Sequence, residues 1–184
     1  MQSFDPDKSG AEIHANDGYR PNVGIVLLNQ LNQVFWARRA GRDGWQFPQG
    51  GVKRNESVEQ ALFRELYEEV GLKRQHVAIV GHTRSWLRYD LPEEYLRRVR
   101  PRGNRKFRGQ KQVWYLLRLI GEESAVSLDN SRKPEFDKWI WTDWWTAVEE
   151  IVEFKREVYE LVWEELCRHL PSNPFYQPSS YLRR

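Results

Sequence analysis

Short apolar runs separated by turn residues recur along the chain, and this pattern is typical of strands in a sheet. Val23 to Leu28 is one apolar run, and Gln33 to Arg38 is a second, partly apolar one. The polar residues between these runs predict two antiparallel strands joined by a turn. A shorter strand is predicted at Trp45 to Phe47. Further strands are predicted at His76 to Leu87, Gln112 to Ile120 and Phe136 to Thr142.

Two segments carry the spacing of amphipathic helices. The first is predicted to begin at Ser57, because Gln60 three residues later completes a capping-box pattern, and to end at Gly71. The second covers Lys155 to His169. Its apolar positions are Val158, Leu161, Val162 and Leu166. Strands of mixed order with two main helices predict an α/β fold.

The length and the distribution of polar residues predict one domain with two tails. A chain of 184 residues is long enough to bury a single core. Residues 1–18 are polar and lack periodicity, so we expect a flexible N-terminal extension. Residues 171–184 contain three prolines and are expected to form a C-terminal tail. The domain itself is placed at residues 19–170.

Composition adds constraints on location. Hydrophobic residues make up 40% of the chain and charged residues 30%, as in ordinary globular proteins. The sequence contains no apolar run near the roughly 20 residues that span a bilayer, and its start lacks the basic and apolar order of an export signal. Cys167 is the only cysteine, which excludes an intramolecular disulfide. We therefore expect a cytoplasmic protein without membrane association, and a monomer as the default oligomeric state.

Three glutamates on the first predicted helix form the most informative cluster. Glu65, Glu68 and Glu69 are spaced i, i+3 and i+4, so their carboxylates leave one face of the helix. Glu65 and Glu69 fall within the apolar arc, whereas a solvated charged face would lie opposite it. Carboxylates packed in this way need a counter-charge. A hard divalent cation supplies it, so Mg²⁺ (or Mn²⁺) is predicted, and the lack of Cys or His nearby argues against zinc.

The segment from Gly50 to Leu72 resembles the signature of the Nudix hydrolases, G-x5-E-x7-R-E-U-x-E-E-x-G-U with U aliphatic, at every fixed position. This resemblance implies the Nudix fold, an α/β/α sandwich with a mixed central sheet. It also implies metal-dependent cleavage of a pyrophosphate linkage. The implied metal ligands are the Gly50 carbonyl and the carboxylates of Glu65, Glu68 and Glu69. Arg64 matches an arginine that orients the signature's first glutamate, Glu56, by a salt bridge. Glu68 or Glu69 is the favoured general base.

Flanking stretches resemble the bacterial RNA pyrophosphohydrolases. They include Trp45-Gln46-Phe47-Pro48-Gln49-Gly50-Gly51, Gly109-Gln110-Lys111-Gln112, Pro134-Glu135-Phe136 and Phe154-Lys155-Arg156. The resemblance implies removal of pyrophosphate, or of phosphates stepwise, from the 5′-triphosphate or diphosphate end of RNA to leave a 5′-monophosphate, which initiates mRNA decay. Dinucleoside polyphosphate hydrolases share much of this pattern. Hydrolysis of diadenosine tetraphosphate or pentaphosphate is therefore the alternative.

The same resemblance implies how the substrate is held. The residues implied at the 5′ phosphates are Arg20, Gln110 and Lys155. Glu135 would be a further metal ligand or base outside the signature. Arg39 and Phe154 would sandwich a nucleobase, since a guanidinium plane and an aromatic ring stack on any base.

Other functions and one charged segment stay open at the level of sequence. An RNA-binding module without catalysis is disfavoured by the intact glutamates, and a hydrolase of modified nucleoside triphosphates is disfavoured by the lack of a dedicated base pocket. The formal net charge is only +3, but Arg97 to Lys111 carries eight basic residues and no acidic one. The basic loop, Arg97 to Arg108, is either solvated or in nonspecific contact with RNA phosphates.

Overall fold

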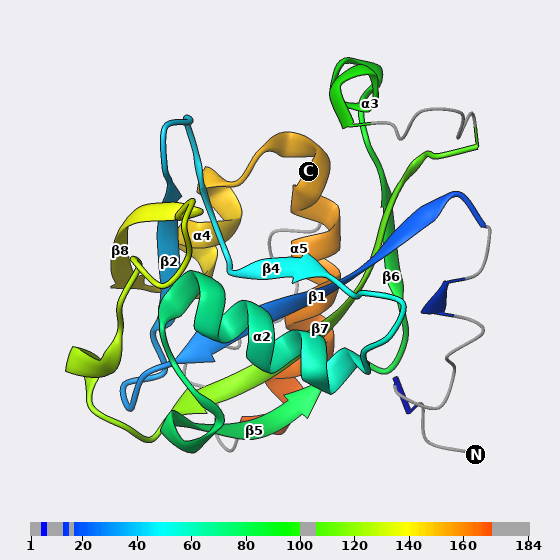
Figure 1. Ribbon diagram of the computed structural model, residues 1–184. Coiled ribbons are helices and arrows are strands. Elements are labelled where there is room, and N and C mark those ends of the chain that lie inside the picture. Colours follow the sequence, from blue (N-terminus) through cyan, green and yellow to red (C-terminus); the bar gives the residue numbers. More distant parts are fainter. Residues whose placement is uncertain (1–4, 7–12, 15–16, 100–105, 171–184) are drawn as a thin grey trace.

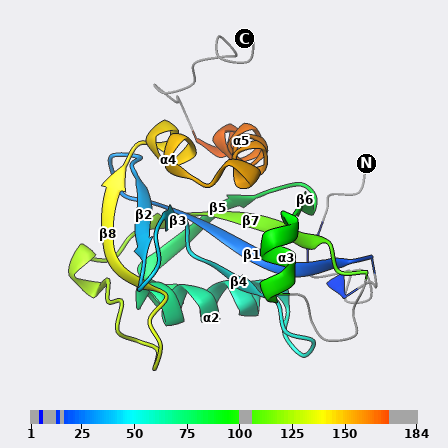
Figure 2. The same ribbon diagram turned by 90° about the horizontal axis from the view of Figure 1, so that it is seen from above.

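The computed structural model describes residues 5–6, 13–14, 17–99 and 106–170. A mixed eight-stranded sheet forms the centre of the molecule. Helix α2 (Val58–Val70) covers one face, and α4 (Trp144–Glu150) and α5 (Glu153–Leu166) cover the other (Figure 1, Figure 2). This arrangement confirms the predicted α/β/α sandwich with a mixed central sheet. Within the described residues, no helix is both long enough and apolar enough to cross a membrane.

The sheet follows the order β3-β2-β1-β7-β5, with β4 on β1, β6 on β7 and β8 on β2. The strands are β1 (Tyr19–Leu28), β2 (Val34–Arg39), β3 (Trp45–Gln46), β4 (Gln49–Gly51), β5 (Val77–His82), β6 (Leu87–Asp90), β7 (Gly109–Leu119) and β8 (Phe136–Thr142). β1 and β7 pair in parallel, from Tyr19 with Gly109 to Leu28 with Arg118. The neighbouring ladders are antiparallel, including the predicted pair β1 and β2.

The prediction of one strand from His76 to Leu87 is wrong, because the chain leaves the ladder between β5 and β6. Thr83 is fully buried, and its hydroxyl accepts a hydrogen bond from the Trp114 main-chain N–H at 3.2 Å. The same hydroxyl donates to the Ser85 carbonyl at 3.2 Å. The Thr83 main-chain N–H still donates to the Trp114 carbonyl at 2.9 Å, but the reciprocal hydrogen bond goes to a side chain, and the regular ladder ends there.

The helix over residues 58–70 has the predicted ends. Ser57 is its N-cap in a capping box with Gln60, and Gly71 ends it with φ 79°. The second main helix begins at Glu153, two residues earlier than predicted, and passes after Leu166 into the 3-10 helix η3 (Cys167–His169). Short elements that the sequence did not predict are α3 (Glu93–Val99), α4, η1 (Arg74–His76) and η2 (Glu123–Ala125). They are too short for a periodic signal.

Each face of the sheet has its own core. The core under α4 and α5 is aromatic and includes Trp36, Phe47, Trp114, Trp144, Tyr159 and Trp163. The core under α2 is mainly aliphatic, and Ile13 belongs to it with 3% exposure. Asp17 Oδ2 accepts a hydrogen bond from Lys111 Nζ at 2.9 Å. These described parts of the N-terminal extension therefore pack on the domain. The C-terminal tail, residues 171–184, lies outside the described residues.

Candidate active site

The turn from β4 into α2 brings Gly50 against the helix that carries the glutamates. A side chain at position 50 would overlap the Glu65 carboxylate, so this close approach requires glycine. Pairing of β4 with β1, which sets Gly50 opposite Val23, holds the turn in place. The Gly50 main chain and the Glu65 carboxylate therefore lie side by side, as an oxygen-rich metal site requires.

Arg64 is the centre of a network of acceptors. It donates to Glu56 at 2.6 and 2.9 Å, to Glu65 at 2.5 Å and to Glu68 at 3.3 Å. It also donates to the Gly51 carbonyl at 2.9 Å. These hydrogen bonds raise the pKa of Arg64, first through Glu56, and lower the pKa of Glu56. Arg64 thus ties the β4–α2 turn to the helix and orients the carboxylates of Glu56, Glu65 and Glu68.

Two of the three α2 glutamates are buried, and a buried carboxylate needs a positive charge beside it to stay ionised. Glu65 and Glu69 are 8% and 9% exposed, whereas the Glu68 side chain is 43% exposed. Burial raises the pKa of Glu69 well above its ordinary value, and the nearby charges of Glu65 and Glu135 add to this effect. Among the described residues, Glu69 accepts one hydrogen bond, from the Gln49 main-chain N–H at 2.9 Å. In the same described part of the chain Glu69 makes no ion pair, although Lys155 is near enough for its charge to interact with this carboxylate.

This donor set fits a hard divalent cation. Carboxylate oxygens with a main-chain carbonyl are the ligands that Mg²⁺ and Mn²⁺ prefer, and a cation would neutralise Glu69. In the part of the chain that the structure describes, no three acidic, His or Cys side chains already converge on one point. Glu65 and Glu68 are held by Arg64 instead. At least one carboxylate would therefore turn from Arg64 to a bound ion.

The buried state of Glu69 leads to a prediction about stability and pH. A carboxyl whose pKa is raised in the folded state favours folding while it is protonated, and this contribution is lost as the pH rises through that pKa. Without metal, Glu69→Gln should therefore melt above the wild type at about pH 8, and the difference should shrink toward about pH 5. Melting curves in EDTA measure it, with the exposed Glu157→Gln as control. A difference that does not change with pH would contradict this account of Glu69.

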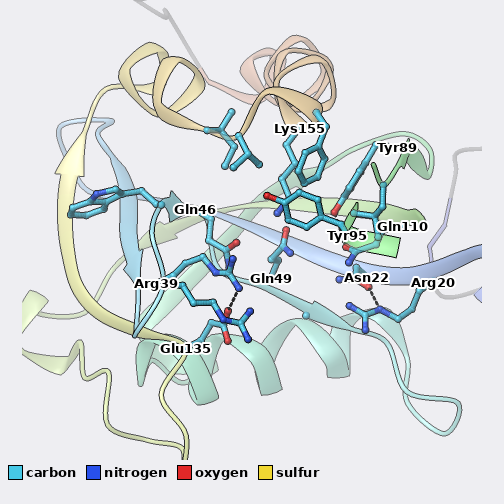
Figure 3. A pocket seen from close by; sticks show the side chains of 18 of the residues that line it. Arg20, Asn22, Arg39, Gln46, Gln49, Tyr89, Tyr95, Gln110, Glu135 and Lys155 are labelled. Carbon is cyan, nitrogen blue, oxygen red and sulfur yellow. Dashed lines mark hydrogen bonds and ion pairs between the residues drawn. The ribbon is translucent and has the colours of Figure 1, made fainter. Parts of the chain in front are cut away.

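A cavity of about 920 Å³ opens beside Glu69 (Figure 3). The sequence-predicted residues that line it are Arg20, Arg39, Gly50, Glu69, Gln110, Glu135, Phe154 and Lys155. They come from β1, β2, β4, α2, β7, α5 and the segment before β8. The remaining predicted residues, Arg64, Glu65 and Glu68, do not line it. The structure thus brings the predicted substrate-binding residues and one glutamate of the cluster, Glu69, to a single cavity.

Two cations in the cavity wall are incompletely paired. Lys155 is 8% exposed, and burial lowers its pKa to about 8, with a further contribution from the nearby Arg39. Arg39 Nη2 lies 3.4 Å from Glu135 Oε1, but its buried Nε has no partner among the described residues. Figure 3 shows the Arg39 and Glu135 side chains meeting at one end of the cavity. These cations are suited to an anionic ligand.

Several cavity residues were missed at the level of sequence. The clearest are Gln49, Tyr89, Tyr95 and Arg98. Tyr95 packs against Phe154 with ring centroids 5.0 Å apart, and Tyr89 lies 6.1 Å from the same ring. Tyr95 and Arg98 belong to α3. Pro92 before this helix, acids in its first turn and arginines in its last are signals that could have predicted it.

The basic loop is only partly within the described residues. Its prediction as a loop from Arg97 is wrong at its start, because Arg97 and Arg98 lie in the last turn of α3. Arg108 pairs with Asp90 at 2.7 Å. Residues 100–105, which hold Arg100, Arg102 and Arg105, lie outside the described residues. RNA contact by this segment stays a prediction.

Comparison with known proteins gives a family and a fold. A family model described as NUDIX domain matches residues 18–162. The E. coli dihydroneopterin triphosphate pyrophosphohydrolase is 18% identical with a TM-score of 0.63, covering 82% of this chain and 98% of that chain. A C. elegans Ap4A hydrolase binary complex is 18% identical with a TM-score of 0.55, covering 77% and 93%. The MutT protein from Methanosarcina mazei Go1 is 17% identical with a TM-score of 0.52, covering 81% and 96%. Identities this low indicate the fold alone.

Proposed function

Because this chain belongs to the NUDIX domain family, we propose that it removes pyrophosphate, or phosphates stepwise, from the 5′-triphosphate or diphosphate end of RNA. The product would be RNA with a 5′-monophosphate, and its release would initiate mRNA decay. The chain is a Nudix pyrophosphohydrolase, and enzymes of this family generally use divalent metal ions such as Mg²⁺ or Mn²⁺. RNA as the substrate is the part of this proposal that goes beyond the family. We propose the cytoplasm as the site of activity, because mRNA decay would take place there.

The observation that carries this proposal is that one cavity has an acidic wall and, facing it, a wall of cations with an aromatic ring. Glu69 and Glu135 form an acidic wall, and Lys155 and Arg39 face it as cations. Phe154 adds an aromatic ring beside the cations. The 5′ end of an RNA matches this arrangement. Its phosphates suit a metal ion and cations, and the nucleobase that follows them has a flat π-face that suits an aromatic ring. A ring and a guanidinium bind such a base without selecting its identity.

The chain's own residues would bind and orient the substrate. The proposed metal ligands are the Gly50 carbonyl and the carboxylates of Glu65, Glu68, Glu69 and Glu135. A bound cation there would neutralise the diphosphate and lower the pKa of an attacking water. Lys155, Arg20 and Gln110 would bind the 5′ phosphates, and Arg39 and Phe154 would sandwich the nucleobase. We assign the proton of the attacking water to an Oε atom of Glu68 or Glu69.

A second candidate function is hydrolysis of diadenosine tetraphosphate or pentaphosphate. The observation that favours it is the group of three rings, Tyr89, Tyr95 and Phe154, at one end of a cavity of about 920 Å³. A second base could stack there. The chemistry at the glutamates would be the same for both substrates.

A comparison of substrates tests the proposal. The purified protein with Mg²⁺ is given 5′-triphosphorylated RNA and, separately, diadenosine tetraphosphate, and kcat/KM is measured for each. The proposal expects the larger kcat/KM for RNA. A larger value for diadenosine tetraphosphate would establish the second candidate instead.

Phe154 provides a prediction about substrate choice. Phe154→Ala should lower kcat/KM for RNA. The expected loss of transition-state stabilisation is roughly 1–3 kcal/mol, the usual contribution of one stacked base. Hydrolysis of a small nucleotide that does not reach this ring should change much less. Phe154→Leu is the matched variant, because it keeps apolar volume against Tyr95 but has no π-face. Equal losses on both substrates, or full rescue by leucine, would assign Phe154 to packing.

A further inference from the structure

A row of hydrogen-bonded side chains lies along β7 beneath the cavity. Gln110, Gln112 and Trp114 alternate along this strand and therefore share one face of the sheet. Trp114 Nε1 lies 3.2 Å from Gln112 Oε1. Gln112 Nε2 lies 3.0 Å from Gln49 Oε1 and 3.5 Å from Gln110 Oε1. Gln112 is completely buried and is the branch point of the row.

The indole fixes the polarity of the whole row. An indole N–H can only donate, so it must meet the carbonyl oxygen of the Gln112 amide. The Gln112 NH₂ group then points away from Trp114, toward Gln49 and Gln110, and both of these must offer carbonyl oxygens. Rotating any of the three amides by 180° would oppose two donors in a buried site, which is costly.

Trp114 is itself held in one orientation. A side chain at position 24 would overlap its ring, so Gly24 lets the indole lie directly on β1. The ring also packs edge-on against Phe47 at 6.0 Å and Tyr159 at 5.2 Å between centroids. Because Trp114 is fully buried among these neighbours, its N–H direction is fixed before any ligand arrives.

The result is a pair of amide donors on the cavity wall. Gln49 Oε1 is taken up by Gln112, and Gln110 Oε1 is taken up by Gln112 and by the Tyr89 hydroxyl at 2.9 Å. Both glutamines line the cavity. Among the described residues, their NH₂ groups have no acceptor. Figure 3 shows both side chains at the cavity, with Gln49 near its centre.

We propose that Gln112 is a positioning residue that turns the NH₂ groups of Gln49 and Gln110 toward the cavity, where they donate to phosphate oxygens of the substrate. This inference rests on the proposed function and adds Gln49 as a phosphate-binding group. The Gln49 main-chain N–H already binds Glu69, so its side chain lies next to the acidic wall. A neutral donor suits that position, since a lysine there would compete with a metal ion for the carboxylates.

The test exchanges the donors of Gln112 for acceptors. Gln112→Glu keeps an acceptor for Trp114, but a carboxylate cannot donate to Gln49 or Gln110, and these amides should turn their carbonyl oxygens to the cavity. Binding of inorganic triphosphate without metal, measured by calorimetry, should weaken roughly 10-fold or more, because donors to a charged ligand become acceptors. With Mg²⁺ bound, the KM for triphosphorylated RNA should rise by a similar factor, while the kcat for this substrate changes by less than about threefold.

Companion variants separate positioning from structure. Gln112→Met removes the orienting donors without burying a charge. Its loss of triphosphate affinity should therefore be smaller than that of Gln112→Glu. It replaces Gln112→Glu in the test if that variant does not fold. Gln33→Glu is the matched control, because that side chain likewise accepts a hydrogen bond, from Asn29 Nδ2 at 2.9 Å, outside the cavity. The losses of Gln112→Glu and Gln49→Met should add only in part, since Gln112 acts through both Gln49 and Gln110.

Two results would overturn the inference: unchanged triphosphate binding and KM in folded Gln112→Glu, or fully additive losses with Gln49→Met. Inorganic triphosphate contains no nucleoside, so its binding does not depend on whether RNA is the substrate, and KM is measured on whichever substrate the wild type hydrolyses. Failure of the proposed function would appear separately, as wild-type enzyme that does not act on triphosphorylated RNA.

Discussion

Glu69→Gln is expected to lower kcat by roughly 100-fold or more, on the order of 3 kcal/mol in the barrier, while the protein stays folded. The substitution removes a charge at nearly constant shape. Glu69 is the glutamate of the cluster that both lines the cavity and is buried, so it is the one placed to hold a cation against the substrate. Glu68→Gln should also lose activity, although Glu68 is more exposed and already paired with Arg64.

The measurement is a steady-state assay with Mg²⁺ on one substrate for all variants, with circular dichroism to check folding. Glu157→Gln is the matched control, because it makes the same change at an exposed position of α5. Near-native turnover by both Glu68→Gln and Glu69→Gln would show that the metal assignment is wrong.

Arg64→Met is expected to reduce both stability and activity. Removing the guanidinium takes the ion-pair partner from Glu56 and Glu65, whose side chains are only 12% and 11% exposed, although Glu56 keeps the Lys53 main-chain N–H as a donor. Breaking a fully buried ion pair costs about 3–5 kcal/mol, and the partial exposure here brings the expected loss to roughly 2–3 kcal/mol of unfolding free energy. Activity should fall as well, because Arg64 also ties Gly51 to the helix.

Arg64→Lys distinguishes charge from geometry. Lysine keeps the positive charge but cannot reproduce the fork that binds Glu56 through two nitrogens. Urea unfolding should therefore place Arg64→Lys between the wild type and Arg64→Met. If Arg64→Met unfolds like the wild type, the network does not stabilise the β4–α2 turn.

Features that depend on neighbouring residues were predictable from the sequence. The capping box of Ser57 and Gln60 and the end of the helix at Gly71 are local signals, and the structure has both. The inward position of Glu65 and Glu69 followed from the helical arc, because residues three and four apart share a face. For the same reason the first helix was predicted more accurately than the strand from His76 to Leu87, whose break depends on Trp114 in another strand.

The cavity was predictable only through the family resemblance. Residues from α2, β2, α5 and α3 reach it, and no local pattern indicates that Lys155 lies near Glu69 and Arg39. The roles of Gln49 and Gln112 depend on the direction of an indole N–H, which is a tertiary feature. Tyr95 was missed because a helix of seven residues gives no periodic signal.

The parallel pairing of β1 with β7 also bears on how the chain folds. Each hydrogen bond of that ladder joins the first strand to residues 109–118, with β2 to β6 between them in the sequence. Contacts this distant make folding slow, because loop-closure entropy is lost before the contacts form. During synthesis β1, whose residues from Pro21 to Leu28 are all buried in the finished protein, emerges long before its partner. Its apolar edge is therefore exposed to chaperones, or to aggregation, until most of the domain has left the ribosome.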